Sequence, residues 1–546
     1  MHWNPRQSPT TQSLGFGTAG VWLCLIGFGV DAMERVDAIE PGALLASEKP
    51  NIVLIYTDDQ GFGDASCLNP DAKFQTPHLD RLAREGITFT NGHSADAVCT
   101  PSRYALLTGR YCWRTRLKRG VLGAESPCLI KDDQMTIASM LGGAGYNTCM
   151  VGKWHLGMDF PGEPGSRDWS KPVQDMPLDK GFESFFGIPA SLNYGVLAWF
   201  EGRHAAVPPT LFTAKKPNRR HVDYRIMPPY QDTPAATRAE LGRTGMEVAP
   251  DFVDNQCLTR FTDRAIEWMG DQIADSKAGK PFFLYLPLTS PHYPVCPLPE
   301  FQGRGDCGAY GEFVIETDHH VGRVLAFLDA RGIAEDTMVI FTSDNGPENS
   351  WKQRIHEFAH HSNGLLRGGK RDIYEGGHRV PFFVRWPGGT LGAGRRWQRA
   401  VGQVDILATL ADVVGVDLPD NAGGDSVSFA TVLRKPMSTW QRSPLINHDA
   451  RGRFAITEGD WKLLLPHGKK QVELYDLASD LAEEHDVASE HPEHVERLMK
   501  SATRIVTQGR STEGRTLPND TGHWSDLAWI GVDEYRQTQT PVGAGE

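Results

Sequence analysis

The chain has 546 residues, of which 40% are hydrophobic and 23% charged, and its formal net charge is −12 at pH 7. That length fits one large domain plus a smaller one. The composition, with 57 Gly and 36 Pro, excludes a disordered, collagen-like or polytopic membrane chain. The acidic balance argues against a general phosphate-backbone binder, so we expect no nucleic-acid partner. An anionic ligand would have to be held by local groups or by a metal ion.

The N-terminus predicts export. An apolar stretch over residues 14–30 follows Arg6, and the small residue Ala32 suits cleavage of a signal peptide that covers residues 1–32. Because the stretch is about as long as the shortest membrane spans, an uncleaved anchor is the alternative. After cleavage we expect no stable membrane span and a periplasmic or extracellular location.

Cysteine and glycosylation patterns refine this expectation. Nine cysteines, one of them inside the predicted signal peptide, are too few and too scattered for a disulfide framework, although one or two bridges remain open. The single Asn-x-Ser/Thr sequon without proline begins at Asn519. Such sparsity favours a bacterial envelope over a heavily glycosylated lysosomal route.

From residue 51 onward, short apolar runs alternate with helical periodicity, which is typical of βα units stacked around a mainly parallel sheet. The predicted strands are 51–57, 147–151, 282–286, 338–342 and 380–386. The predicted helices are 77–86, 135–141, 313–328 and 405–414. The sequence therefore predicts an α/β fold in which helices sandwich a large, mainly parallel sheet.

The pattern changes at two places. Residues 159–251 are rich in Pro, aromatic residues and Arg without periodicity, and long loops of this kind usually carry function. After residue 443, short strands at 454–457, 461–465 and 472–476 precede an amphipathic helix at 490–506. We expect a large α/β domain at 48–442, a C-terminal α+β subdomain with a short antiparallel sheet at 443–510, and a poorly ordered tail at 511–546.

Two pairs of oxygen-bearing side chains follow predicted strands. Asp58 and Asp59 come after the first strand, and Asp344 and Asn345 follow the strand at 338–342. Adjacent carboxylates repel each other unless a cation neutralises them, and hard oxygen ligands suit Ca²⁺ or Mg²⁺. Open α/β sheets bind ligands at the carboxyl ends of their strands, so the two pairs can converge on one cation. Alone, each pair would be interpreted as a turn after a strand.

A third segment reads Cys99-Thr100-Pro101-Ser102-Arg103. Pro101 suits the first turn of a helix, which places Cys99 at the positive end of that helix and Arg103 one turn further on. Such a position favours an anion. By chance, Cys-x-Pro-Ser-Arg should occur in roughly one chain in a thousand of this length.

This segment resembles the signature of the type I sulfatases, the formylglycine-dependent, arylsulfatase-like enzymes of the alkaline-phosphatase superfamily. Residues 145–157 are similar to the family's second signature, and the resemblance runs from about residue 50 to 480. It implies that a formylglycine-generating maturation enzyme oxidises Cys99, and that one Ca²⁺ is bound by Asp58, Asp59, Asp344, Asn345 and the modified Cys99. The implied catalytic residues are Cys99, Arg103, Lys153, His155, His292 and Lys370.

The resemblance implies hydrolysis of a sulfate ester by a formylglycine gem-diol nucleophile through a sulfo-enzyme intermediate. In that scheme Arg103 hydrogen-bonds the hydrated aldehyde, and Asp344 is the base. His292 protonates the departing alcohol, and His155 deprotonates the second hydroxyl to expel sulfate. Lys153 and Lys370 add positive charge around the sulfate.

The predicted export and the long loops at 159–251 together favour a sulfated carbohydrate, of galactose or hexosamine type, as the substrate. Aromatic rings and basic groups suit a sulfated sugar, and residues 159–251 contain Trp169, Tyr194, Trp199, Arg203, His204 and the basic run 215–221. Two alternatives remain: a phosphonate or phosphate ester hydrolase of the same superfamily, and a catalytically inactive Ca²⁺-dependent glycan-binding protein.

Overall fold

The computed structural model describes residues 49–214, 230, 245–390 and 392–539. In this part of the chain, ten strands form one sheet in the order β14-β2-β13-β12-β1-β11-β4-β5-β7-β8. Its centre is parallel and buried, and consists of β12 (Thr337–Ser343), β1 (Asn51–Asp58), β11 (Phe282–Pro291) and β4 (Asn147–Lys153). The predicted α/β class with a mainly parallel sheet is confirmed.

The strand expected at 380–386 exists as β13 (Phe382–Arg385), but it runs antiparallel to β12. Beyond it lie β2 (Ile87–Phe89), antiparallel to β13, and β14 (Arg395–Trp397), parallel to β2. The mixed pairing is therefore gathered at the edges, while the parallel centre carries the strand ends that position the site.

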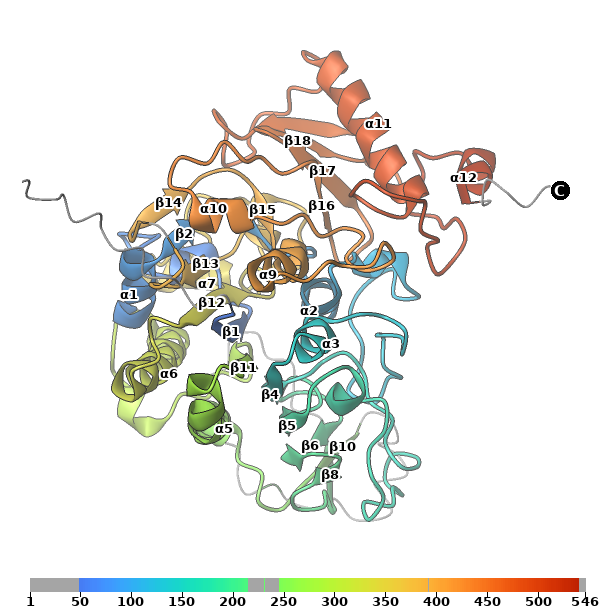
Figure 1. Cartoon of the computed structure of the whole chain (residues 1–546). Helices are drawn as coiled ribbons and strands as arrows, with labels where there is room; N and C mark the ends of the chain where they lie inside the picture. The colour runs from blue at the N-terminus through green and yellow to red at the C-terminus, as the bar shows by residue number, and fades with distance from the viewer. Residues whose placement is uncertain (1–48, 215–229, 231–244, 391, 540–546) are drawn as a thin grey trace, which may run out of the picture. The chain divides into compact units, whose positions relative to one another are not determined.

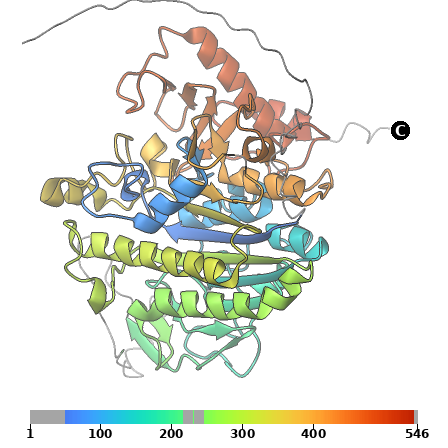
Figure 2. The same cartoon turned by 60° about the vertical axis from the view of Figure 1, so that its left-hand side comes forward.

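Helices cover both faces of the sheet (Figures 1 and 2). One face is covered by α1 (Pro77–Glu85), α5 (Cys257–Lys277) and α6 (Gly308–Arg331). The other is covered by α2 (Cys99–Thr108), α3 (Ile137–Gly143) and α9 (Ile406–Val414). All four helices expected in this domain are present, and the 21-residue α5 is an addition to them.

The region expected to lack regular structure contains several short strands, so that expectation is wrong for its described part. The strands β5 (Ser184–Ile188), β7 (Phe200–Glu201) and β8 (His204–Ala205) extend the large sheet. A separate three-stranded sheet consists of β6 (Val196–Leu197), β9 (Leu211–Ala214) and β10 (Gly245–Val248). The basic run at 215–221 lies outside the described residues, as does the predicted signal peptide.

The C-terminal region contains the expected antiparallel sheet, with β17 (Phe454–Glu458), β18 (Trp461–Leu464) and β19 (Glu473–Asp476), followed by α11 (Pro492–Gln508). A further strand, β16 (Leu445–His448), pairs with β17.

The tail expected to be poorly ordered is packed over residues 511–539 instead. Leu527, Ile530 and Tyr535 join the hydrophobic core of this domain, and α12 (Val532–Gln539) ends the described chain. Asn519 of the sequon is buried and donates a hydrogen bond to the carbonyl oxygen of Val506 at 2.9 Å.

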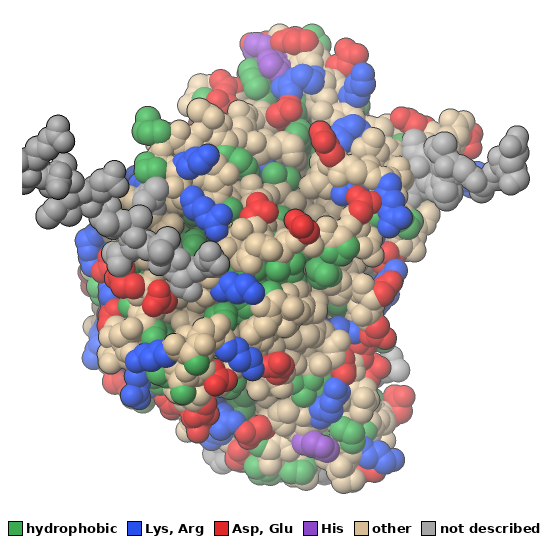
Figure 3. All heavy atoms as spheres, viewed as in Figure 1, with side chains coloured by type: hydrophobic (Ala, Val, Ile, Leu, Met, Phe, Trp, Pro, Cys, Tyr) green, Lys and Arg blue, Asp and Glu red, His purple; other side chains and the backbone are tan. Residues whose placement is uncertain are grey.

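Three further properties concern the whole described chain. Its eight cysteines are all free thiols. Among the described helices, none combines the length and apolar character that a membrane crossing needs. On the face shown in Figure 3, acidic and basic side chains are interspersed.

A buried ion cluster joins the C-terminal sheet to the segment at 366–378. The ammonium group of Lys462, on β18, lies 2.9 Å from Glu375 of α8 (Glu375–His378) and 2.8 Å from Glu483, and none of the three side chains is exposed to solvent. Tyr374 also donates a hydrogen bond to Glu473 at 2.9 Å. Burial raises the pKa of Glu483 to about 7, with a further contribution from Glu375. The segment at 366–378 is therefore anchored to strands that follow it by about a hundred residues.

Replacing Lys462 by Met should lower the free energy of unfolding by about 3–5 kcal/mol, because two buried carboxylates lose their cation. The pKa of Glu483 lies above its ordinary value, so its contribution to stability is present at low pH and is lost as the pH rises through about 7. Thermal unfolding should therefore show that Lys462→Met loses more stability relative to wild type at pH 8 than at pH 6. Lys469→Met, at an exposed lysine, is the control; an equal loss in both variants would contradict the assignment.

Candidate active site

The residues expected to form the site meet at the carboxyl ends of the central strands. Asp58 ends β1 and Lys153 ends β4, while Asp344 follows β12 and His292 follows β11. Because β1 pairs in parallel with both β12 and β11, these ends lie side by side. Ligand atoms of Asp58, Asp344 and Cys99 lie within 4.8 Å of one another.

Hydrogen bonds tie the two acidic turns together. The backbone N–H of Asp59 donates to Asp344 Oδ1 at 3.1 Å, and the Asn345 side-chain amide donates to Asp59 Oδ1 at 2.7 Å. Asp59 has a φ of 69°, a left-handed conformation that aspartate tolerates better than most residues. Gly346 is required for space, since a Cβ there would lie 1.8 Å from the carbonyl oxygen of Gly376.

Three cations face the three carboxylates. Arg103 donates to Asp344 Oδ2 through Nε at 3.1 Å and Nη2 at 2.8 Å. Lys153 Nζ lies 2.5 Å from Asp58 Oδ2, and Lys370 Nζ lies 2.6 and 2.7 Å from the two oxygens of Asp59. All six side chains are buried. With all three carboxylates ionised, the charges of the six side chains balance, and a bound divalent cation would then leave the site net positive.

The two central carboxylates differ in proton affinity. Burial, followed by the charge of Asp58, raises the pKa of Asp344 to about 7. Burial acts on Asp58 in the same direction, but Lys153, His292 and Arg103 together outweigh it and hold the pKa of Asp58 well below its ordinary value. Asp58 therefore carries its negative charge throughout the physiological range.

The groups fit a metal ion by their chemistry. Asp58 Oδ1 and Asn345 Oδ1 are both buried without a hydrogen-bond partner, and an unpaired buried oxygen is costly. Carboxylate and amide oxygens are the ligands that Ca²⁺ and Mg²⁺ prefer. Asp58, Asp59, Asp344 and Asn345 could therefore hold one hard divalent cation.

Cys99 occupies the first position of α2, directly after Val98, and only 2% of the residue is exposed. Burial raises the pKa of its thiol despite the nearby charges of Lys153 and Lys370. The unmodified side chain is thus a neutral thiol, which is a poor nucleophile. Position 99 therefore lies where a helix attracts an anion, but the neutral thiol of an unmodified cysteine is poorly suited to attack one.

His155 and His292 differ in which ring nitrogen contacts a backbone carbonyl oxygen: Nε2 in His155 and Nδ1 in His292. His155 Nε2 lies 3.0 Å from the carbonyl oxygen of Leu122, which can only accept, so Nε2 carries the proton. Its Nδ1 is buried without a partner, and burial, with Lys153 and Arg103, holds the pKa of His155 well below its ordinary value. This neutral ring can accept a proton at Nδ1. His292 Nδ1 lies 2.5 Å from the carbonyl oxygen of Tyr293, and Nε2 lies 3.9 Å from Asp59 Oδ2.

The proposed sugar contacts are only partly near this centre. The ring of Tyr194 lies edge-on to His155, with 4.8 Å between centroids. Trp199 is buried and stacks on Phe252 at 4.5 Å, so it belongs to the core. Trp169 packs near Phe200. Of the remaining two, Arg203 pairs with Asp179, and His204 is exposed on β8.

Sequence reasoning missed two groups beside the expected residues. Glu348 pairs with Arg371 at 2.6 and 2.8 Å and lies 3.9 Å from Lys370. Asn193 donates to the hydroxyl of Tyr293 at 2.8 Å, and the Tyr293 ring stacks on His292. Glu348 follows Asp344 by only four residues, so its sequence position was a signal that it lies near the same end of β12.

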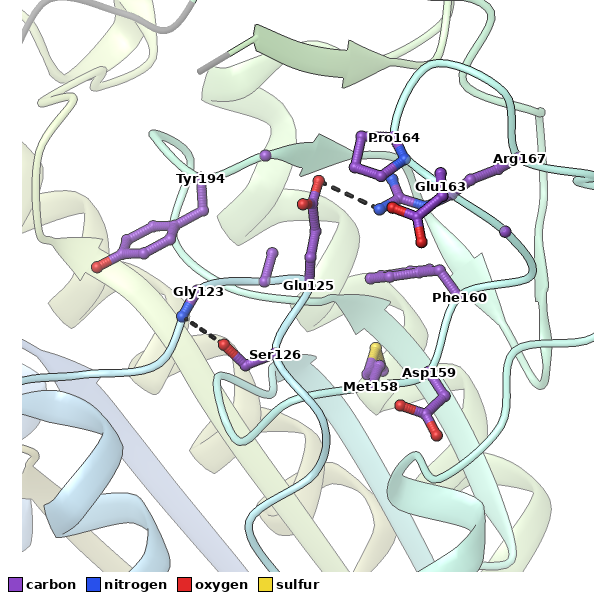
Figure 4. Close-up of a pocket in the computed structure, with 13 residues that line it drawn as sticks. Gly123, Glu125, Ser126, Met158, Asp159, Phe160, Glu163, Pro164, Arg167 and Tyr194 are labelled. Carbon is purple, nitrogen blue, oxygen red and sulfur yellow. Dashed lines mark hydrogen bonds and ion pairs between the residues drawn. The ribbon is translucent and has the colours of Figure 1, made fainter. Parts of the chain in front are cut away.

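A cavity of about 640 Å³ adjoins Tyr194 (Figure 4). It is bordered by three segments, at 123–126, 158–167 and 194–195. Its first segment continues directly from Leu122, the residue that contacts His155.

Comparison with known proteins decides the family. A model described as Sulfatase matches residues 50–416, and one described as N-sulphoglucosamine sulphohydrolase, C-terminal, matches residues 368–508. The chain belongs to the sulfatase family. The resemblance expected from the two signatures is thereby confirmed, and this sulfatase is a sulfuric ester hydrolase.

Several relatives match more than three quarters of the sulfatase chain. An N-acetylgalactosamine-6-O-sulfatase of Bacteroides thetaiotaomicron is 31% identical over 494 residues, which cover 85% of this chain and 94% of the relative. Human arylsulfatase A is 33% identical over 424 residues, covering 77% of this chain and 75% of the relative. A solved B. thetaiotaomicron structure, described under metabolism of multiple glycosaminoglycans, has a TM-score of 0.72 at 30% identity and covers 84% of this chain and 99% of its own.

If the four oxygen-bearing side chains hold Ca²⁺, the ion should stabilise the fold. At a free concentration about a hundred times the dissociation constant, the gain is about 2.7 kcal/mol. Asp58→Asn should lose most of that gain, because it removes one charged ligand. Calorimetry with Ca²⁺ and with chelator measures how much the ion stabilises wild type and Asp58→Asn. Glu348→Gln is the control. An unchanged Ca²⁺ effect in Asp58→Asn would contradict the assignment.

Proposed function

We propose that this sulfatase removes sulfate from a sulfated carbohydrate of galactose or hexosamine type, with a formylglycine made from Cys99 and one Ca²⁺. The observation that carries the proposal is Cys99 at the positive end of α2, facing Arg103, Lys153 and Lys370. The 31% identical N-acetylgalactosamine-6-O-sulfatase makes N-acetylgalactosamine 6-sulfate the first substrate to test.

Asp58, Asp59, Asp344 and Asn345 would hold the Ca²⁺, beside position 99, where the ion would supply positive charge for the sulfate oxygens. The formylglycine would supply a hydrated aldehyde that attacks sulfur and afterwards reverts to the aldehyde as sulfate leaves, which a cysteine or serine cannot do.

The remaining steps belong to side chains of this chain. Arg103 and Lys153 orient position 99 and the sulfate in a buried space where fixed charges act strongly. The unpartnered Nδ1 of His155 accepts the proton released at position 99. His292 protonates the departing sugar oxygen, and Lys370 binds the sulfate from the side of Asp59.

Burial of Cys99 supports an early modification. With 2% of the residue exposed, the thiol is inaccessible to a maturation enzyme once the chain has folded. We place the modification before folding, on a chain exported by the signal peptide at 1–32 to the periplasm or beyond. We also propose that the catalytic domain covers residues 48–442 and the C-terminal subdomain residues 443–510.

Matured protein should release sulfate from N-acetylgalactosamine 6-sulfate, and Cys99→Ala should lower kcat by about 10⁴-fold or more. Released sulfate is measured directly, after mass spectrometry of the Cys99 peptide shows replacement of H₂S by one oxygen, the mass change of conversion to formylglycine. Faster cleavage of a phosphonate ester would favour the phosphonate hydrolase. Glycan binding without any turnover by matured protein would favour the inactive binding protein.

His292→Ala should separate the leaving-group step from sulfate binding. A sugar alkoxide needs a proton to depart, so kcat on the sugar sulfate should fall by about 10²–10⁴-fold. Kcat on 4-nitrophenyl sulfate should change much less, because its phenolate leaves without protonation. Equal losses on the two substrates would assign His292 a role other than proton donor.

A further inference from the structure

We infer that the cavity beside Tyr194 binds the uncharged face of the sugar ring that carries the sulfate, and that Glu125 excludes a second anionic group from that ring. This inference rests on the proposed function and adds a specificity-determining residue to it.

The cavity opens next to the reacting groups. Tyr194 lines the cavity and lies against His155. Leu122, which precedes the cavity's first segment, accepts from His155 Nε2 through its carbonyl oxygen and donates its N–H to Thr100 Oγ1 at 3.2 Å. Thr100 is the neighbour of Cys99. A ring attached to a sulfate at position 99 therefore lies within reach of this cavity.

The carboxylate of Glu125 is held in place. In Figure 4 it projects between Tyr194 on one side and Arg167 on the other. Glu125 Oε1 lies 3.2 Å from Arg167 Nη2, and the Arg167 side chain is only 2% exposed. Arg167 also pairs with Glu247 and lies over the ring of Phe160, 4.8 Å from its centroid. The wall is thus ordered before any ligand arrives, which reduces the entropic cost of binding.

The absence of a side chain at Gly195 leaves room for the carboxylate of Glu125. A Cβ at Gly195 would lie 2.8 Å from Glu125 Oε1, so a larger residue there would displace the acid. Glu125 remains 28% exposed at its side chain, and one carboxylate can accept several hydrogen bonds. It is therefore both fixed and available to a ligand.

The charge of the cavity selects what enters it. Its lining carries the carboxylates of Glu125, Asp159 and Glu163, and among the described residues that border it, Arg167 is the one cation. Arg167 is already shared by two carboxylates. The cavity consequently attracts hydroxyl and amide N–H groups and repels sulfate or carboxylate.

A second cavity near the site has the opposite sign. Its volume is about 570 Å³, and its lining includes Lys352, Lys370, Arg371 and Arg451 against the single acid Asp372. Anionic parts of a larger substrate fit this cavity better. The Tyr194 cavity, with two aromatic rings and hydrogen-bond acceptors, suits an uncharged sugar ring.

The test compares N-acetylgalactosamine 6-sulfate with its 4,6-disulfated form, using matured wild type, Glu125→Gln and Glu335→Gln. Glutamine keeps the shape of residue 125 and removes its charge. Glu125→Gln should raise KM for the monosulfated sugar about tenfold and lower KM for the disulfated sugar, with kcat little changed. Glu335→Gln removes the same charge at an exposed position before the amino end of β12, at the opposite end of that strand from the site, and should leave the preference as in wild type.

Unchanged KM values in Glu125→Gln, or loss of the preference in Glu335→Gln, would overturn the inference. Turnover of 4-nitrophenyl sulfate and the sugar sulfates by wild type reports on the proposed function separately. Should wild type turn over none of these, saturation-transfer NMR with unsulfated N-acetylgalactosamine still tests the cavity. Glu125→Gln should then weaken the signal about tenfold, and equal signals in the two proteins would reject the site.

Discussion

Three buried carboxylates and three buried cations share one space at the carboxyl ends of β1, β4 and β12, and the rest of the structure serves to hold them there. Removing ions from water costs several kcal/mol for each, and only close pairing offsets it. Each of Asp58, Asp59 and Asp344 has its own cation within hydrogen-bond distance. This balance is what allows a chain with a net charge of −12 to present positive groups to an anion.

The same balance explains why the elements around the site are so constrained. The parallel register of β1 with β11 and β12 brings the acidic turns together, and α2 directs Arg103 at Asp344 while its first residue, Cys99, stays covered. The site therefore combines a rigid polar interior with one nearby cavity of negative character, next to Tyr194. In the proposed function, sulfate recognition and sugar recognition fall to different walls of the site.

Much of this was predictable from the residues, for identifiable reasons. Buried parallel strands are continuous apolar runs, so β1, β4, β11 and β12 could be predicted, but such a run does not encode direction, and β13 proved antiparallel. Strands of two residues in the 159–251 region carry no periodic signal. The helix α5 did carry one, since Leu258, Phe261, Ala265 and Met269 share a stripe that is buried, but mostly polar positions separate them.

The site shows a similar division. The motifs identified its members, but which lysine pairs with which aspartate depends on three-dimensional contacts. Trp199 was a reasonable sugar contact by type, yet it packs in the core, whereas Tyr194 faces the reacting groups. The packing of the segment at 511–539 escaped prediction because its buried residues Leu527, Ile530 and Tyr535 are separated by polar residues without strand or helix periodicity.

The anchoring of the segment at 366–378 has a consequence for biosynthesis. Lys370 lies in a stretch whose neighbours Tyr374 and Glu375 are fastened to Glu473 and Lys462. A nascent chain reaches those partners only near the end of translation. Lys370, which we propose binds sulfate, would acquire a fixed position last, so a chain cut short before β18 would be an incomplete catalyst even with every signature residue present.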